Sequence, residues 1–323
     1  MSGGLDSILA ARVIMDQGIE VQGISFVIGF ASRDNRTFEQ HVRKAAEEIG
    51  LPLRVIDISQ EFLDVLGAPR HGYGANINPC IDCKILMLKK AKEIMEREKF
   101  DFIITGEVLG ERPMSQRRDA LNTIKNHSGL GGHLLRPLSA KLLEETIPEK
   151  EGIVDRSRLL DIRGRSRKPQ FALAEQYGIG KFAQPAGGCL LTDPGFAARI
   201  KDLMARGCLD PDNVKLSKMG RHFRLDLATK AILGRDDKEN NALMSQKKEK
   251  DVALRIFFDP GPYALLRGDT SEHNIRIAAS LVASHSKKKN ETSAEIEFWT
   301  EEDDTKTIVV SPMGRIELEK LRI

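Results

Sequence analysis

Residues 1–15 read MSGGLDSILAARVIM, a serine- and glycine-rich loop that runs directly into an apolar helical stretch. Glycines allow a backbone to approach an anion closely, and serine hydroxyls add hydrogen-bond donors. The unpaired amides at the N-terminus of the following helix attract negative charge. The stretch therefore predicts a phosphate-binding loop made of Ser2, Gly3, Gly4, Leu5, Asp6 and Ser7. The simpler alternative is a serine and glycine N-cap on an ordinary helix.

The segments after the loop alternate between strand-like and helical patterns. The expected strands are residues 20–26, 53–58 and 102–106, and the expected helices run from about 37 to 50 and from 84 to 98. This alternation predicts a parallel, doubly wound α/β sheet, in which ligands bind beyond the carboxyl ends of the strands. Ser25, Phe26, Thr105 and Gly106 fall at such ends, so we expect them beside the loop.

A phosphate loop in such a sheet ordinarily follows a buried parallel strand, which aims the loop at its ligand. The sequence leaves no residues before the loop to form that strand. We therefore expect that the true start of the protein lies upstream and that the first strand is missing here.

Composition limits the class of protein. A length of 323 residues suggests about two domains, and 41% hydrophobic residues suffice for ordinary cores. Because the chain has neither a run of about eighteen apolar residues nor a leader-like N-terminus, we expect a cytoplasmic protein. Four cysteines are too few for a disulfide scaffold in such a chain, which favours metal or redox chemistry. A formal net charge of +3 restricts any nucleic-acid surface to a local patch.

The pattern of expected elements changes along the chain. We expect a catalytic domain over residues 1–214, with a mainly helical extension from about residue 136, and a smaller α+β domain over residues 215–323. Residues 216–220 are the expected linker. The second domain has strand-like runs at 252–258, 294–299 and 307–310 and one helix at about 271–284.

Cysteines mark a second site. Cys80 and Cys83 form a C-x-x-C at the entrance of a helix, where amide dipoles and the adjacent Lys84 are expected to lower thiol pKa values. Cys189 follows two glycines that allow close approach by a ligand, whereas Cys208 is expected to be a small buried side chain. Three thiolates could hold a [4Fe–4S] cluster with one open iron. A redox pair that carries and resolves a persulfide is the alternative.

These motifs together resemble the PP-loop ATP pyrophosphatases, and within them the tRNA thiouridine synthetases and 2-thiouridylases. The resemblance rests on the loop, the C-x-x-C with its distant third cysteine, the string Thr105 to Gly110, and Ser115-Gln116. It covers most of residues 1–210. Relatives often have glutamine where this chain has Glu111. The RNA-binding THUMP domain, the rhodanese domain and the extra zinc fingers of some relatives have no counterpart here.

The resemblance implies an ATP-dependent tRNA sulfurtransferase. The uridine carbonyl oxygen would attack the α-phosphorus, pyrophosphate would leave into the loop, and sulfur would then displace AMP. Asp6, Cys80, Cys83 and Cys189 are the implied catalytic residues, with the three cysteines as ligands in the cluster alternative. The loop, Ser25, Phe26, Thr105 and Gly106 would bind ATP, and Asp6 could position Mg²⁺. Implied partners are tRNA and a sulfur donor, either sulfide or a persulfide carrier; a homodimer is left open.

The C-terminal part is similar to the RNA-binding module of the NFACT proteins, on the glycine-arginine-aspartate turn that begins at Gly234. We expect it to hold tRNA phosphates, which give affinity and register without sequence information. Phe257, Phe258 and Trp299 are expected in the core. The candidate RNA-binding residues are Arg112, Arg117, Arg118, Arg235, Lys247 and Lys248, with Arg136, Arg221, His222 and Arg224 as further candidates.

Two other functions are compatible with the sequence. One keeps the adenylation chemistry but moves it to a small molecule or a carrier, as other PP-loop enzymes do. The other is a non-catalytic RNA-binding protein in which the first domain has lost its activity.

Overall fold

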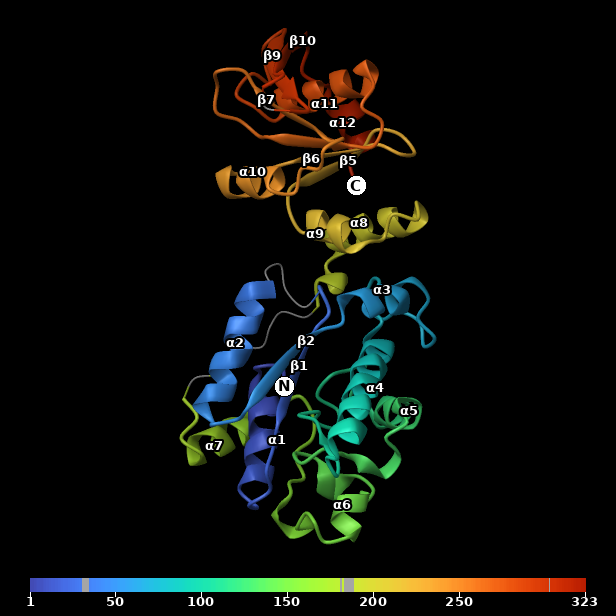
Figure 1. Cartoon of the computed structure of the whole chain (residues 1–323), viewed down its shortest axis with the longest axis vertical. Helices are drawn as coiled ribbons and strands as arrows, with labels where there is room; N and C mark the ends of the chain where they lie inside the picture. The colour runs from blue at the N-terminus through green and yellow to red at the C-terminus, as the bar shows by residue number, and fades with distance from the viewer. Residues whose placement is uncertain (31–34, 181, 183–188, 302) are drawn as a thin grey trace. The chain divides into compact units, whose positions relative to one another are not determined.

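The computed structural model describes residues 1–30, 35–180, 182, 189–301 and 303–323. The chain divides into two compact units, Met1–Asp193 and Pro194–Ile323. Each is a mixed arrangement of helices and strands (Figure 1).

The first unit contains two parallel strand pairs. Strands β1 and β2 pair from Gly23 opposite Leu53 to Val27 opposite Asp57, and β3 pairs with β4. The α-helices and strands are α1 (Leu5–Met15), β1 (Gly23–Val27), α2 (Asn35–Glu48), β2 (Leu53–Asp57), α3 (Ser59–Gly67), α4 (Cys80–Glu98), β3 (Ile103–Ile104), α5 (Arg118–Ser128), β4 (Leu134–Leu135), α6 (Ile147–Lys150) and α7 (Lys168–Gln176). The expected alternation of parallel strands and helices is confirmed.

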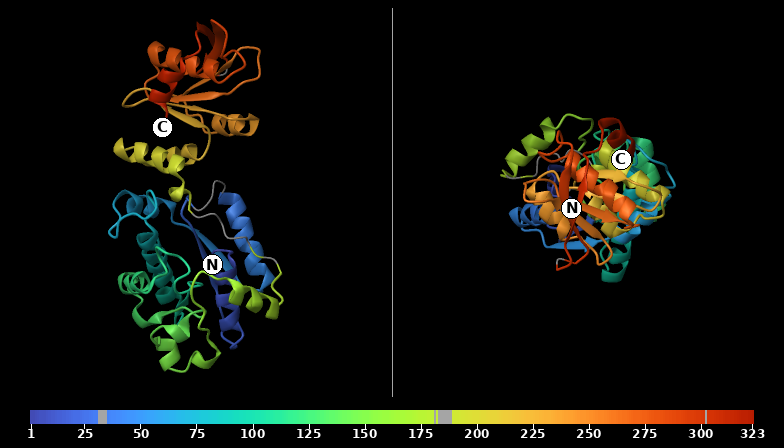
Figure 2. Two further views of the ribbon diagram at one scale, coloured as in Figure 1. Left: turned by 180° about the vertical axis from the view of Figure 1, so that it is seen from behind. Right: turned by 90° about the horizontal axis from the view of Figure 1, so that it is seen from above.

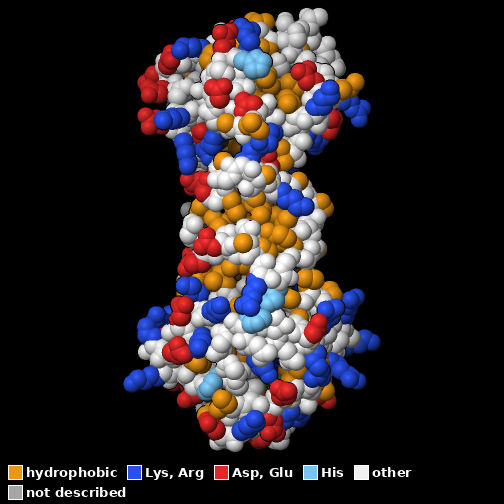
Figure 3. Space-filling model, turned by 90° about the vertical axis from the view of Figure 1, so that its right-hand side faces the viewer, with side chains coloured by type: hydrophobic (Ala, Val, Ile, Leu, Met, Phe, Trp, Pro, Cys, Tyr) orange, Lys and Arg blue, Asp and Glu red, His pale blue; other side chains and the backbone are white. Residues whose placement is uncertain are grey.

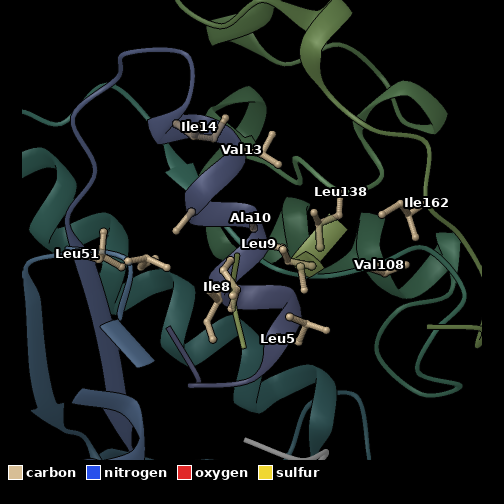
Figure 4. Close-up of a cluster of buried hydrophobic side chains, with 14 of the residues drawn as sticks. Leu5, Ile8, Leu9, Ala10, Val13, Ile14, Leu51, Val108, Leu138 and Ile162 are labelled. Atoms are coloured by element: carbon tan, nitrogen blue, oxygen red, sulfur yellow. The ribbon is translucent and has the colours of Figure 1, made fainter. Parts of the chain in front are cut away.

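Helix α1 forms the centre of this unit. Its apolar side chains are buried around most of the helix: Leu5, Ile8, Leu9, Ala10, Ala11, Val13 and Ile14. They pack against Leu51, Val108, Leu138 and Ile162, which come from four separate segments (Figure 4). Helix α7 contacts α1 as well (Figure 1). Because the helix is held on nearly every side, the loop at its N-terminus has a fixed position.

The second unit is built on a six-stranded antiparallel sheet of order β10-β9-β7-β8-β6-β5. Helix α11 packs against β7, β8, β9 and β10 (Figure 2). The elements are α8 (Pro194–Ala205), α9 (Pro211–Ser217), β5 (Arg221–Arg224), β6 (Lys230–Leu233), α10 (Asp237–Met244), β7 (Val252–Ile256), β8 (Ala264–Arg267), α11 (Glu272–Ser284), β9 (Ala294–Trp299), β10 (Lys306–Val310) and α12 (Arg315–Leu321).

Helices α8 and α9 belong with this sheet. Asp202 of α8 pairs with Arg224 of β5 at 2.5 Å and lies 3.8 Å from Lys230 of β6. Leu216, within the expected linker, is buried in a cluster with Ile232 and Leu265. Along the chain, the boundary between the compact units therefore falls between residues 193 and 194. The sequence predicts the domain boundary between residues 214 and 215.

The aromatic side chains at the end of β7 differ from one another. Trp299 is buried, as expected, and Phe257 is half-buried. Phe258 is 91% exposed, so its expected place in the core is wrong. The strand ends at Ile256, and the chain then turns Phe258 outward.

Charged side chains of both signs are interspersed on the face shown in Figure 3, without one continuous basic surface. Among the described residues, no helix combines the length and the apolar character needed to cross a membrane.

Gly106 should be intolerant of any side chain. A Cβ atom there would lie 2.6 Å from the backbone of Asp6 and Ser7, atoms that the buried helix α1 cannot move. We expect Gly106→Ala to lower the free energy of unfolding by about 1–3 kcal/mol, measured by urea denaturation of the full chain. The matched control is Gly67→Ala, where a Cβ meets nothing within 4 Å. Equal stability of the two variants would contradict this packing.

Candidate functional site

The loop before α1 has the geometry of an anion cradle. Gly3 has a φ of +73°, a conformation that glycine adopts without strain. Gly4 is the N-cap of α1 and provides no side-chain cap, so no capping side chain competes with an anion for the first amides of the helix. The Ser2 and Ser7 hydroxyls lie 3.2 Å apart, and Ser7 Oγ also donates to the Gly4 carbonyl. These groups surround one concave stretch of backbone.

Beside the loop lies a cluster of polar side chains with unsatisfied atoms. Arg167 lies 3.9 Å from Asp6 and 4.0 Å from Glu111. Gln170 is fully buried next to Asp6. Within the described part of the chain, no hydrogen bond reaches Asp6 Oδ1, Glu111 Oε2, Arg167 Nε or either amide atom of Gln170. Buried polar groups in native proteins ordinarily have partners, so this cluster has the character of a ligand site.

The pKa values of both carboxyl groups in that cluster are raised. Burial raises the pKa of Asp6, and Arg167 only partly offsets it. Burial and the neighbouring Asp6 carboxylate raise the pKa of Glu111. Two carboxylates with free oxygens are suitable ligands for Mg²⁺, which is usually held by one or two carboxylates together with substrate phosphates. The residues therefore fit the expected magnesium and phosphate chemistry.

Gly106 lies directly against the loop, whereas Ser25 is buried in the middle of β1 and not at its carboxyl end as expected. Ser25 Oγ has no hydrogen-bond partner among the described residues. Phe26 is half-buried on the same strand. The Thr105 hydroxyl instead donates to Glu107 at 3.1 Å. The structure thus brings Gly106 to the loop, leaves the Ser25 hydroxyl for a ligand, and engages Thr105 in a network.

Glu107 is the centre of that network and was missed as a site residue. It is 2% exposed, accepts a hydrogen bond from Arg136 at 2.9 Å and lies 3.8 Å from Lys84. Burial opposes ionisation, but Lys84 and Arg136 together lower the pKa of Glu107. Arg136 is itself buried, so it does not fit the expected contact with tRNA. The sequence signal was an acidic residue directly after the third strand.

The three cysteines come from two segments that lie far apart in the sequence, and one of these segments contacts Phe30. Cys80 is the first residue of α4, with Asn78 Nδ2 donating to its sulfur at 3.2 Å, and Cys83 lies one turn later. Cys189 Sγ contacts the carbonyl of Phe30, just beyond β1, at 3.5 Å. The backbone of residues 190–192 is hydrogen-bonded to Phe30 and to residues 76–77.

Electrostatics also link the three cysteines. Cys80 and Cys189 both contribute to raising the pKa of Cys83, and Cys80 contributes to that of Cys189. Cys208 lies in the second unit, where it is exposed; its expected burial is wrong. Cys80, Cys83 and Cys189 therefore influence one another's ionisation, whereas Cys208 belongs to the other unit.

The expected lowering of the thiol pKa is wrong for Cys83. Burial raises the pKa of Cys83 to about 12, although Lys84 opposes the shift. Burial likewise raises the pKa of Cys189 to about 11. A helix N-terminus and one lysine do not compensate for the loss of water around the sulfur. Both side chains are therefore protonated thiols at neutral pH.

The residues as arranged do not fit a [4Fe–4S] cluster. Over the described ranges, no three His, Cys, Asp or Glu side chains gather closely enough to hold a metal ion. We therefore derive no step through a cluster.

A carboxylate inside the C-x-x-C was also missed. Asp82 is 8% exposed and accepts hydrogen bonds from the backbone amide of His71 at 2.9 Å and from His71 Nδ1 at 2.8 Å. His71 Nε2 lies 3.0 Å from Nδ1 of His127 on α5. This chain ties the segment before α4 to the turn that carries Cys80 and Cys83.

Most of the expected RNA-binding residues take part in intramolecular contacts. In the first unit Arg117 pairs with Asp119, Arg118 donates to the Leu142 carbonyl, and the Arg112 amide donates to Gln116. Exposed pairs of this kind are weak, so they leave the guanidinium groups able to exchange partners.

In the second unit Arg235 pairs with Glu239, Lys247 with the Thr300 carbonyl and Lys248 with Asp212. His222 is 2% exposed, and burial holds its pKa well below the usual range, so it is a neutral core group.

Comparisons with known proteins agree with this geometry. Residues 1–155 match the family model of the thiamine biosynthesis protein ThiI, and residues 220–322 match the NFACT protein RNA binding domain. Both resemblances seen in the sequence are confirmed. The first unit is thus similar to the ThiI family over residues 1–155, and the second to the NFACT RNA binding domain over residues 220–322.

Individual relatives cover only part of the chain. The tRNA-specific 2-thiouridylase MnmA of Natranaerobius thermophilus is 31% identical over 124 residues, 33% of each chain. That of Frankia alni is 28% identical over 152 residues, 42% of each. The matched segment thus spans about a third of the length of the first of these relatives.

A solved structure of the C-terminal part of the fibronectin/fibrinogen-binding protein from Streptococcus suis is 14% identical, covers 75% of this chain and 89% of that chain, and has a TM-score of 0.30.

The raised thiol pKa values predict a steep pH dependence of cysteine alkylation. Only the thiolate reacts, and its fraction grows about tenfold per pH unit below the pKa. We expect iodoacetamide to modify Cys189 slowly at pH 7.5 and progressively faster up to pH 10, measured by mass spectrometry of the peptides. Cys208, which is exposed, is the internal control. Equal rates for Cys189 and Cys208 at pH 7.5 would contradict the assignment.

Proposed function

We propose that this protein is an ATP-dependent tRNA sulfurtransferase that adenylates a uridine carbonyl oxygen and replaces it with sulfur. One observation carries the proposal: the phosphate-type loop at the buried helix α1 adjoins the segment that follows β3, and Cys189 adjoins the segment that follows β1, within the same unit. Gly106 after β3 touches the loop, and Phe30 after β1 holds Cys189. An adenylating site and a sulfur site in one unit match the chemistry of the related enzymes.

On the ATP side, the loop residues Ser2 to Ser7 receive the pyrophosphate part through backbone amides and hydroxyls. Asp6 and Glu111 hold Mg²⁺, which would neutralise charge on the phosphates. Arg167, which lies between these two carboxylates, compensates their charge when the site is empty and turns to phosphate when ATP is bound. Ser25, Phe26, Thr105 and Gly106 complete the site for the nucleoside. The chain thus supplies mainly position and charge.

On the sulfur side, Cys189 or Cys80 carries a persulfide received from a persulfide carrier, and its outer sulfur attacks the adenylated carbon as AMP leaves. A second cysteine then attacks the inner sulfur, which frees the thiouridine and leaves a disulfide that an external thiol reduces. The protonated state of Cys83 and Cys189 protects these thiols from adventitious oxidation until a donor arrives. Asn78, which donates to Cys80 Sγ, supports negative charge on that sulfur. Cys80 is therefore the best placed to act as the thiolate.

Several finer features belong to the same proposal. The parallel strands of the first unit are parts of a doubly wound sheet of the adenine nucleotide alpha hydrolase type. The second unit holds tRNA, the donor is a persulfide carrier, and the protein works in the cytoplasm. The chemistry belongs to the first unit, Met1–Asp193, and the RNA binding to the second, Pro194–Ile323.

The proposal predicts the loss of one thiolated nucleoside from cells that lack the gene. Plasmid-borne wild type should restore it, and Cys189→Ala should not, because the third sulfur of the group is gone. The matched control is Cys208→Ala, which removes an exposed cysteine of the other unit and should restore it fully. Mass spectrometry of total tRNA nucleosides measures the outcome. An unchanged nucleoside profile in the deletion would contradict the proposal.

A second prediction concerns the ATP half alone. Asp6→Asn removes a buried charge from the cluster beside the loop and should reduce tRNA-dependent AMP formation by about tenfold or more. Asp64→Asn, on the exposed side of α3, should leave the rate unchanged. AMP formation without any tRNA requirement would favour a small-molecule or carrier acceptor. RNA binding with no ATP turnover would favour the non-catalytic function.

A further inference from the structure

Phe258 combines two unfavourable features that its contacts in the second unit do not explain. The side chain is 91% exposed, and its φ is +55°, a left-handed conformation that is an outlier for a bulky residue. Phe257, whose amide is bonded to Glu295 of β9, fixes the preceding residue, and the Asp259 amide closes the turn onto the Phe257 carbonyl. Backbone strain of this kind is concentrated at functional sites.

Phe258 borders a cavity of about 330 Å³. This volume lies at the small end of the range for ligand pockets, about 300–1,000 Å³. The lining residues used here are Arg255, Phe258, Asp259, Gly261, Tyr263 and Glu297.

Planar groups form a firm wall of this cavity. The Arg255 guanidinium lies 5.9 Å from the centre of the Tyr263 ring and 5.4 Å from that of Trp299. Glu297 holds Arg255 through a hydrogen bond of 2.5 Å. The rings of Tyr263 and Trp299 are perpendicular, at 89°. These contacts preorganise Tyr263 and Arg255 as flat surfaces.

The turn that begins at Gly234 builds the same wall. Asn240, 5% exposed in helix α10, accepts a hydrogen bond from the Tyr263 amide at 2.9 Å and donates to the Gly261 carbonyl at 3.2 Å. A Cβ on Gly234 would lie 2.2 Å from Asn240 Oδ1, so only glycine allows this arrangement. The motif that resembles the NFACT module therefore shapes the cavity, besides carrying Arg235.

We propose that this cavity receives one unpaired base of the bound RNA, stacked on Phe258 and facing Tyr263 and Arg255. This inference rests on the proposed RNA-binding function of the second unit. Aromatic rings bind bases through their faces, independently of sequence. The carboxylates of Asp259, Glu297 and Asp237 line the cavity and repel phosphate, so the occupant is a base rather than the backbone.

The proposal has a signature that separates stacking from ionic contact. Phe258→Ala should weaken binding of a fluorescein-labelled single-stranded oligoribonucleotide by about tenfold, with an unchanged slope of log affinity against log salt. Phe258→Trp should retain the affinity. Leu227→Ala, which truncates another exposed apolar side chain of this unit (79% exposed), is the matched control and should bind as wild type does. Fluorescence anisotropy of the full-length protein measures all four.

Folding is checked with one further variant. Phe258→Gly relieves the left-handed strain, so it should unfold at a higher temperature than Phe258→Ala while binding equally weakly.

If wild type binds RNA and Phe258→Ala binds equally well, the base pocket is wrong and the RNA-binding function stands. If wild type binds neither the oligoribonucleotide nor tRNA, the RNA-binding function is wrong and the pocket with it.

Discussion

The buried helix α1 is the constraint on which the first unit depends. Its apolar side chains join segments that lie far apart in the sequence of that unit, and Gly106 lies so close to its first turn that a single methyl group would not fit. The loop is therefore rigid before any ligand arrives. Preorganised amides stabilise phosphate charge without having to reorganise during the reaction, which is the chief contribution such a loop can make.

Burial also determines the protonation state of the cysteines. Cys83 and Cys189 are shielded from water, which raises their pKa values to about 12 and about 11. At neutral pH both are therefore protonated thiols, which are poor nucleophiles. Beside the loop, buried polar atoms lack the hydrogen-bond partners that a ligand would provide. They belong to Asp6, Glu111, Arg167 and Gln170. The substrates of an adenylating sulfur transfer would change both halves of the site. ATP would provide hydrogen-bond partners beside the loop, and a sulfur donor would react with the cysteines.

Local signals in the sequence predicted a good part of this. The glycine-serine loop, the C-x-x-C and strands β9 and β10 lie within a few residues of where the patterns put them, because turn residues and alternation act over short distances. The Glu107 network and the high thiol pKa values depend on burial by segments far apart in sequence, so no local pattern carries them. Phe258 was missed because an apolar run normally continues a strand, whereas here the strand ends two residues earlier.

The central claim is that adenylation and sulfur insertion are one reaction. It is tested most directly by loading the purified full-length protein with sulfur from a low-molecular-weight persulfide, removing the excess, and quantifying AMP and thiouridine together after a single turnover with unmodified tRNA, α-labelled ATP and Mg²⁺. The account predicts that the two products form in equal amounts and that Cys208→Ala behaves as wild type does. Formation of ADP, or of AMP without thiouridine, would contradict it.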